Sequence, residues 1–115
     1  MKMEELKKII RAKLIEVINR TQPIITYSNL KKECKINIIL PNLVKILDEI
    51  NEEEKEINRP LMSIVVVKEK DKAPGSVFFK KAIDKGWFTK KRYTSYVDFY
   101  TRQIIALQEC WIGSK

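Results

Sequence analysis

The sequence RPLMSIVVV at residues 59–67 carries the strongest strand signal in the chain. Residues 64–67 are all Ile or Val, and β-branched side chains favour an extended backbone. The run 61–67 is apolar except for Ser63, which is typical of a strand buried on both faces. Arg59 precedes Pro60 and is therefore disfavoured in the helical region. We predict that a helix ends here and that a central strand follows over residues 61–67.

A helix and a short strand are predicted at the start of the chain. Apolar residues recur at spacings of three and four over residues 3–20, with Lys and Arg mostly between them. This pattern indicates an amphipathic helix with a basic outer face. Pro23 interrupts it, and the β-branched run 24–26 predicts a short strand that ends at Tyr27.

Two further helices are predicted between this short strand and residue 59. Ser28 has the chemistry of a helix cap, so a short second helix should follow with Leu30 and Cys34 facing inward. A third helix should open at Pro41 or Asn42 and end near residue 58. Its expected buried positions are Leu43, Ile46, Leu47, Ile50 and Ile57.

Two more helical segments are predicted after the central strand. The turn residues 73–75 should lead back to the core at Phe78 and Phe79, and residues 80–85 should form helical turns that end at Gly86. A last helix should begin near residue 94, capped by Thr94 or Ser95. Its apolar stripe comprises Val97, Tyr100, Ile104, Leu107 and Trp111.

The order of these elements predicts an α+β fold that is winged-helix-like, with helices packed on a small β-sheet. The chain has 115 residues, no internal repeat and no low-complexity linker. We therefore expect a single domain over residues 1–115, with a winged-helix-like part at 1–79 and a C-terminal helical extension at 80–115.

Composition places the chain among ordinary globular proteins, with 44% hydrophobic and 33% charged residues. Its longest apolar runs are too short to span a bilayer, and the N-terminus lacks the pattern of a secretory signal, so we expect a cytoplasmic protein without a membrane partner. Cys34 and Cys110 belong to no metal-binding pattern, and both are predicted to be buried reduced thiols.

An enzymatic function is not predicted. The chain has no His, which excludes Ser-His-Asp and Cys-His pairs, and its three Gly form no phosphate-binding loop. The carboxylates of residues 49–56 share a helix face, but such charge runs are usually solvated. We therefore expect no catalytic residue, no metal and no cofactor.

Nucleic-acid binding is the leading functional hypothesis. The net charge is +8, although the acidic block at residues 48–56 should face away from a polyanion. A winged-helix geometry would place Asn42 and Lys45, at the start of the third helix, nearest to base edges, with duplex DNA as the first choice. The first helix should assist. The residues expected to contact phosphates are Tyr27, Ser28, Asn29, Lys31, Lys32 and Lys35. The alternative is that these lysines serve only solubility.

A second basic and aromatic patch is a further candidate. Basic residues beside exposed rings suit single-stranded nucleic acid, where bases stack on the rings. Trp87 and Tyr93 are either exposed beside a charged loop or part of the core, and both interpretations stay open. The patch comprises Lys85, Trp87, Lys90, Lys91, Arg92 and Tyr93.

Three segments of the chain resemble motifs of two known groups of proteins. The segments RPLMSIVVV at 59–67 and PGSVFF at 74–79 resemble motifs of a group of small uncharacterised microbial proteins, a likeness that covers residues 24–111 loosely and implies no established activity. The pair Tyr27-Ser28 resembles the Tyr-containing pair before the second helix in the DNA-binding half of alkyltransferase and alkyltransferase-like proteins. In that family the pair lies against the DNA backbone, so this resemblance implies a winged-helix scaffold.

The second resemblance does not extend to the family's chemistry. Residues 59–63 are Arg-Pro-Leu-Met-Ser where the family has Pro-Cys-His-Arg, so the alkyl-accepting cysteine is missing. The predicted third helix also has no arginine to replace a flipped base. Alkyl transfer and base flipping are therefore not implied.

A protein-binding module is the alternative of a different class. The absence of catalytic motifs, the acidic end of the third helix and the aromatic last helix would suit an adaptor or inhibitor from a mobile element or defence system. In that hypothesis the last helix docks a partner helix. Its docking stripe would be Tyr96, Tyr100, Ile104, Leu107 and Trp111. The sequence does not predict an oligomeric state.

Overall fold

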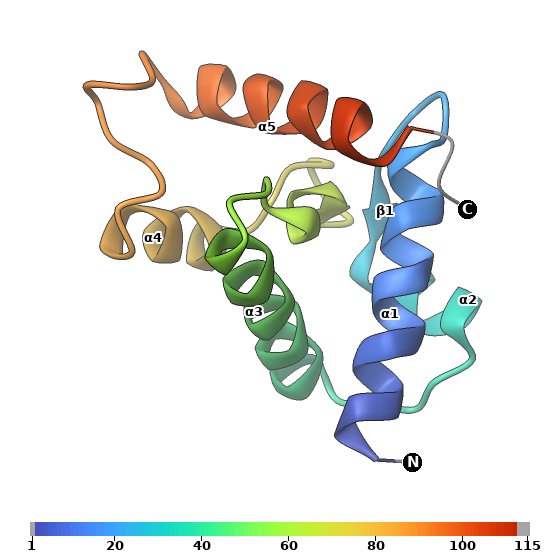
Figure 1. The fold of residues 1–115 in the computed structure, drawn as a ribbon. Coiled ribbons are helices and arrows are strands. Elements are labelled where there is room, and N and C mark those ends of the chain that lie inside the picture. Colours follow the sequence, from blue (N-terminus) through green and yellow to red (C-terminus); the bar gives the residue numbers. More distant parts are fainter. Residues whose placement is uncertain (1, 113–115) are drawn as a thin grey trace.

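Helices dominate the structure, a computed structural model that describes residues 2–112 (Figure 1). The only sheet in this range has two short parallel strands, so the architecture is compatible with the predicted α+β class. In chain order the elements are α1 (Met3–Ile18), β1 (Ile25–Thr26), α2 (Tyr27–Cys34), α3 (Leu40–Glu56), the 3-10 helix η1 (Met62–Val65), β2 (Val66–Val67), α4 (Ser76–Asp84) and α5 (Tyr96–Trp111).

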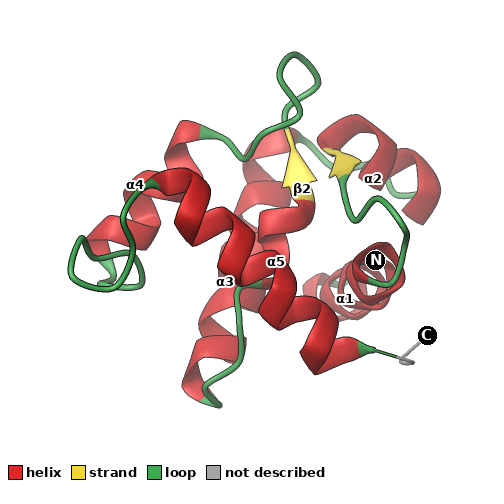
Figure 2. Cartoon of the chain, turned by 90° about the horizontal axis from the view of Figure 1, so that it is seen from above, coloured by secondary structure: helices red, strands yellow, loops and turns green. Residues whose placement is uncertain are grey.

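The two strands pair in parallel, with Ile25 opposite Val66 and Thr26 opposite Val67. Helix α2 packs beside this pair (Figure 2). A wing is a β-hairpin, and a hairpin requires antiparallel strands. No hairpin occurs between residues 2 and 112, so the structure does not confirm the winged-helix arrangement.

The predicted strand at 61–67 is wrong over most of its length, because residues 62–65 form η1 and only Val66 and Val67 are extended. Side chains from two helices take the place of a neighbouring strand. The Leu61 amide donates to Gln103 Oε1 at 3.0 Å, and the Ser63 amide donates to Asn51 Oδ1 at 3.1 Å. Since these donors are satisfied without a strand partner, the segment need not be extended. Its predicted burial is confirmed throughout.

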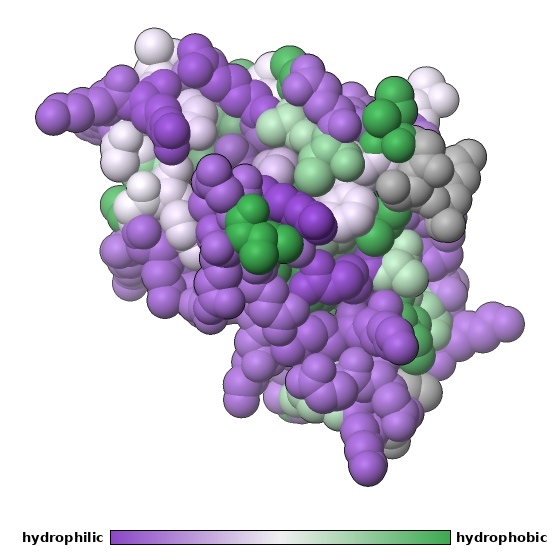
Figure 3. Space-filling model, viewed as in Figure 1, coloured by the Kyte–Doolittle hydropathy of each residue, from purple (hydrophilic) through white to green (hydrophobic). Residues whose placement is uncertain are grey.

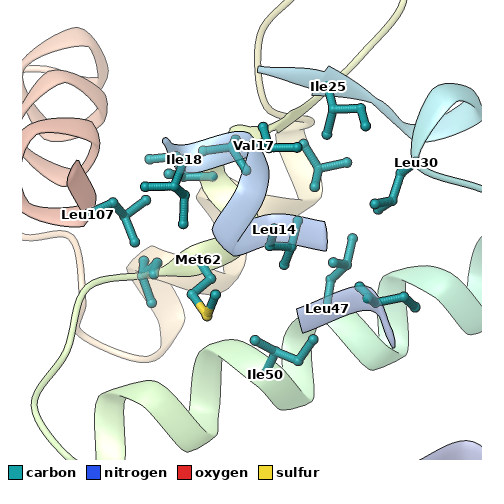
Figure 4. Close-up of a cluster of buried hydrophobic side chains, with 14 of the residues drawn as sticks. Leu14, Val17, Ile18, Ile25, Leu30, Leu47, Ile50, Met62 and Leu107 are labelled. Atoms are coloured by element: carbon teal, nitrogen blue, oxygen red, sulfur yellow. The ribbon is translucent and has the colours of Figure 1, made fainter. Parts of the chain in front are cut away.

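Helix α1 supplies a central part of the core. Its residues Ile10, Leu14, Val17 and Ile18 are fully buried, as the predicted amphipathic pattern requires. Figure 4 shows Leu14, Val17 and Ile18 converging with Leu30 of α2, Leu47 and Ile50 of α3, Met62 of η1 and Leu107 of α5. The helix ends at Ile18, two residues before the predicted end.

The caps of two helices differ in how well they were predicted. Thr26 rather than Ser28 caps α2, because the Asn29 amide donates to Thr26 Oγ1 at 3.2 Å. At α5 the predicted cap is confirmed, since the Asp98 amide donates to Ser95 Oγ at 3.1 Å. Cap prediction therefore succeeded in the helix where the cap directly follows a loop.

Several side chains predicted to be buried are exposed. Ile57 lies just beyond the last turn of α3 and is 57% exposed. In α5 the buried stripe is Phe99, Gln103 and Leu107, whereas Val97 is 73% exposed.

The two cysteines also depart from the prediction that both are buried. Cys34 is half-buried, and Cys110 is exposed. The last turn of α5 uses Trp111 to contact the core, and the side chain of Cys110 is rotated by about 100° from it.

Candidate nucleic-acid interface

Helix α2 presents the three lysines that were predicted to contact phosphates. Lys32 and Lys35 are exposed and Lys31 is half-buried. The helix ends where Lys35 adopts a left-handed conformation, with φ of 55°, and its amide donates to the Lys32 carbonyl at 3.1 Å. Within residues 2–112, none of these three lysines forms an ion pair.

The single carboxylate of α2 is already neutralised by Lys13 of α1 and by Arg20, just beyond the end of α1. Glu33 Oε1 lies 2.8 Å from Arg20 Nη2 and 3.5 Å from Lys13 Nζ. The hydrogen bond from Arg20 is the main cause that lowers the pKa of Glu33. Because Glu33 is engaged by Lys13 and Arg20, it does not compensate the lysines of its own helix.

The first turn of α2 is divided between solvent and core. Ser28 and Asn29 are exposed and can donate to phosphate oxygens. Tyr27 is half-buried, and it lines a hollow of about 280 Å³ together with Asp48 and Gly75. Burial, and then the charge of Asp48, raise the pKa of Tyr27. Tyr27 is therefore less accessible to a phosphate backbone than the two residues that follow it.

The start of α3 carries Asn42 and Lys45, and both are exposed. Helix α2 packs mainly on α1, β1 and β2 and has little contact with α3. The two helices are joined by residues 36–39, which have no regular secondary structure. The structure thus does not pack α2 on α3 as a compact helix-turn-helix would.

The basic face of α1 is largely neutralised, so the structure does not support the expected help from this helix. Lys7 Nζ lies 2.7 Å from Glu53 Oε2, and Arg11 contacts both Glu53 and Glu54 at 2.5 and 2.9 Å. Lys13 and Arg20 pair with Glu16 and Glu33. Figure 3 shows how hydrophilic side chains cover most of the face over α1 and α3.

These ion pairs were not predicted from the sequence, although a signal was present. Lys7 and Arg11 are four residues apart in α1, and Glu49 and Glu53 are four residues apart in α3. Residues at this spacing lie on one face of a helix. Two complementary charged faces therefore pointed to packing of α1 on α3, as the structure shows.

The rings of the second predicted patch belong to the core. Tyr93 is buried, stacks on Phe88 with ring centroids 5.9 Å apart, and meets Phe99 edge-on at 4.9 Å. Trp87 is half-buried against the same cluster. These two rings thus follow the core interpretation rather than the exposed one.

The charged residues of the second patch differ in whether they form ion pairs. Lys85 pairs with Glu52 at 2.9 Å. Lys90, Lys91 and Arg92 are exposed, and in the described chain they form no ion pair. Burial, and then the positive charge of Arg92, lower the pKa of Lys55 at the end of α3. Binding at this patch stays a prediction.

Comparison with known proteins adds no constraint to this geometry. No family model, curated protein or solved structure matches the chain. In the described range, no helix has the length and apolarity to cross a membrane, and no cluster of His, Cys, Asp or Glu is arranged to hold a metal ion.

Proposed function

We propose that this protein binds nucleic acid electrostatically, with duplex DNA as the preferred form, through the surface of α2. The observation that carries the proposal is the uncompensated charge of Lys31, Lys32 and Lys35 beside a neutralised Glu33. Lysine contacts to phosphates release counterions and supply most of the affinity in sequence-independent binding. Ser28 and Asn29 add hydroxyl and amide donors next to this charge.

In this proposal the protein shares one feature with winged-helix proteins, an exposed helix that contacts the DNA backbone. Without an antiparallel hairpin in residues 2–112, no wing contributes. Asn42 and Lys45 are proposed as weaker contacts from the start of α3. We expect little dependence on base sequence, because phosphate contacts position a protein without reading bases.

A salt titration with labelled duplex and single-stranded DNA tests the proposal by fluorescence anisotropy. Three phosphate contacts predict that log affinity falls with log salt with a slope of roughly −3. The double variant Lys31→Glu/Lys32→Glu should bind DNA at least about tenfold more weakly at low salt, whatever the base sequence. Its log affinity should fall with log salt with a slope of about −1.

The double variant Lys72→Glu/Lys80→Glu is the matched control, because it makes the same charge change before and within α4, at exposed lysines outside both predicted nucleic-acid patches. It should retain binding to within about threefold, since long-range effects of surface charges are largely screened. Absence of binding to either DNA at low salt would overturn the proposal. If both double variants lost DNA affinity equally, α2 would not be the centre of the binding site.

A further inference from the structure

Two adjoining hollows lie between α4 and α5, away from α2. The larger has a volume of about 580 Å³ and is lined by Ile83, Phe88, Lys90 and Tyr96 among others. The smaller, about 290 Å³, is lined by Pro74, Phe79, Tyr96, Val97, Tyr100 and Lys72. Since Tyr96 lines both, the hollows form one surface, here called the α4–α5 surface.

The α4–α5 surface is apolar and open to solvent. Ile83 is 46% exposed, Tyr96 49% and Val97 73%. Helix α5 directs Phe99, Gln103 and Leu107 into the core, so its second apolar face at residues 96, 97 and 100 is left without a complete cover. The Tyr96 ring is held between Phe79 and Phe88, with centroids 4.7 and 5.0 Å away. It therefore forms a fixed ridge between the hollows.

The charged residues that line the α4–α5 surface have one sign. The only charged residues that line the two hollows are Lys72 and Lys90, and no carboxylate does. Lys80 lies three residues before Ile83 on the same face of α4. Among the described residues these three lysines have no ion-pair partner, whereas the cations of α1 that face α3 are paired.

We infer that the α4–α5 surface docks an amphipathic helix of a partner protein, with apolar side chains in the two hollows and acidic residues on its flanks. Neighbouring apolar hollows suit side chains spaced by three, four or seven residues on one helix. The free lysines complement acidic flanks and steer such a partner. A second copy of this chain fits worse, because a twofold interface would place these lysines against their own counterparts.

Two synthetic helical peptides of about 16 residues test the inference. Both carry Leu at positions i, i+3, i+4 and i+7; one has Glu at the remaining positions and the other Lys. Fluorescence anisotropy should show the acidic peptide bound at least about tenfold more tightly than the basic one. The variants Ile83→Asp and Val97→Asp should each weaken binding of the acidic peptide at least about tenfold.

Ile105→Asp is the matched control, because Ile105 is 51% exposed on α5 but lines neither hollow. It should retain peptide binding, as should Lys31→Glu/Lys32→Glu, so failure here is distinct from failure of DNA binding. Equal affinity for both peptides, or unchanged binding in Val97→Asp, would overturn the inference. The inference would also be overturned if the protein self-associated or bound anionic vesicles and Val97→Asp abolished that association or binding.

Discussion

At the scale of single residues, Asn51 explains why the most strand-like segment becomes a 3-10 helix. Asn51 is 1% exposed on α3, and its Nδ2 donates to Ser63 Oγ at 2.7 Å while its Oδ1 accepts from the Ser63 amide at 3.1 Å. Residue propensity for strands is weak and depends on context. One buried amide that satisfies both backbone and side chain of Ser63 therefore outweighs the β-branched run around it.

The first prediction concerns this pair. Asn51→Ala should lower the free energy of unfolding by about 2–3 kcal/mol, because it leaves buried polar groups of Ser63 without partners. Ser63→Ala should lower the free energy of unfolding by about half as much, since the hydrogen bond from the backbone amide of residue 63 to Asn51 remains. Urea unfolding measures both. Asn42→Ala, an exposed Asn on the same helix, should stay within about 0.5 kcal/mol of wild type; an equal effect at both asparagines would contradict the role of Asn51.

At the scale of elements, ion pairs of Glu33 with Lys13 and Arg20 add to the apolar contact between α2 and α1. Hydrogen bonds from Arg20 and Lys13 lower the pKa of Glu16 to about 2, and Arg20 also lowers the pKa of Glu33. These acidic groups are more easily protonated in the unfolded chain than in the folded one. Their contribution to stability is therefore complete above about pH 4.5 and is lost as pH falls toward about 2.

The second prediction follows from these shifts. Wild type should lose part of its stability between pH 5 and pH 2.5, with about 0.2–1 kcal/mol of that loss due to these exposed pairs. The variant Glu16→Gln/Glu33→Gln should start less stable at neutral pH and lose correspondingly less on acidification. Thermal unfolding at several pH values measures the difference. Glu5→Gln/Glu56→Gln, at exposed carboxylates without ion pairs in the described part, should keep the wild-type pH dependence.

At the scale of the whole molecule, one buried cluster includes residues from both predicted parts, 1–79 and 80–115. Phe99 and Leu107 of α5 are fully buried in the same cluster as Leu14 of α1 and Met62 of η1. Helix α4 also runs across the predicted boundary, from Ser76 to Asp84. The C-terminal part thus completes the core of the N-terminal part.

The third prediction tests this dependence. A chain that ends at residue 79 should show no cooperative thermal transition, because it loses Phe99, Leu107 and the Gln103 acceptor of the Leu61 amide. The full chain is the control and should show one cooperative transition. A cooperative transition in the shorter chain would instead show that residues 1–79 fold independently.

Local sequence signals predicted most helices to within a few residues, although α4 begins at Ser76 rather than at residue 80. The pattern at residues 3–20 gave α1 to within two residues, and Gly86 marked the end of α4 with its positive φ of 75°. These features are local, since a 3.6-residue period and a left-handed glycine act within a few residues of the chain. Nothing local revealed that α5 has a second, uncovered apolar face, because the stripe at 96–111 contains both faces.

Local sequence patterns were enough to place α1, α3 and α5, and to show that residues 61–67 are buried and that α2 is basic, because periodicity, apolarity and charge belong to the residues themselves. Tertiary structure alone decided that residues 62–65 are not a strand and which cations stay free. Both outcomes depend on partners far away in the chain: Asn51 and Gln103 supply hydrogen bonds to η1 and the residue before it, and Glu53 neutralises Lys7 and Arg11. Local spacing marks the charged faces of α1 and α3, but packing between distant segments decides which faces and which hydrogen-bonding groups meet.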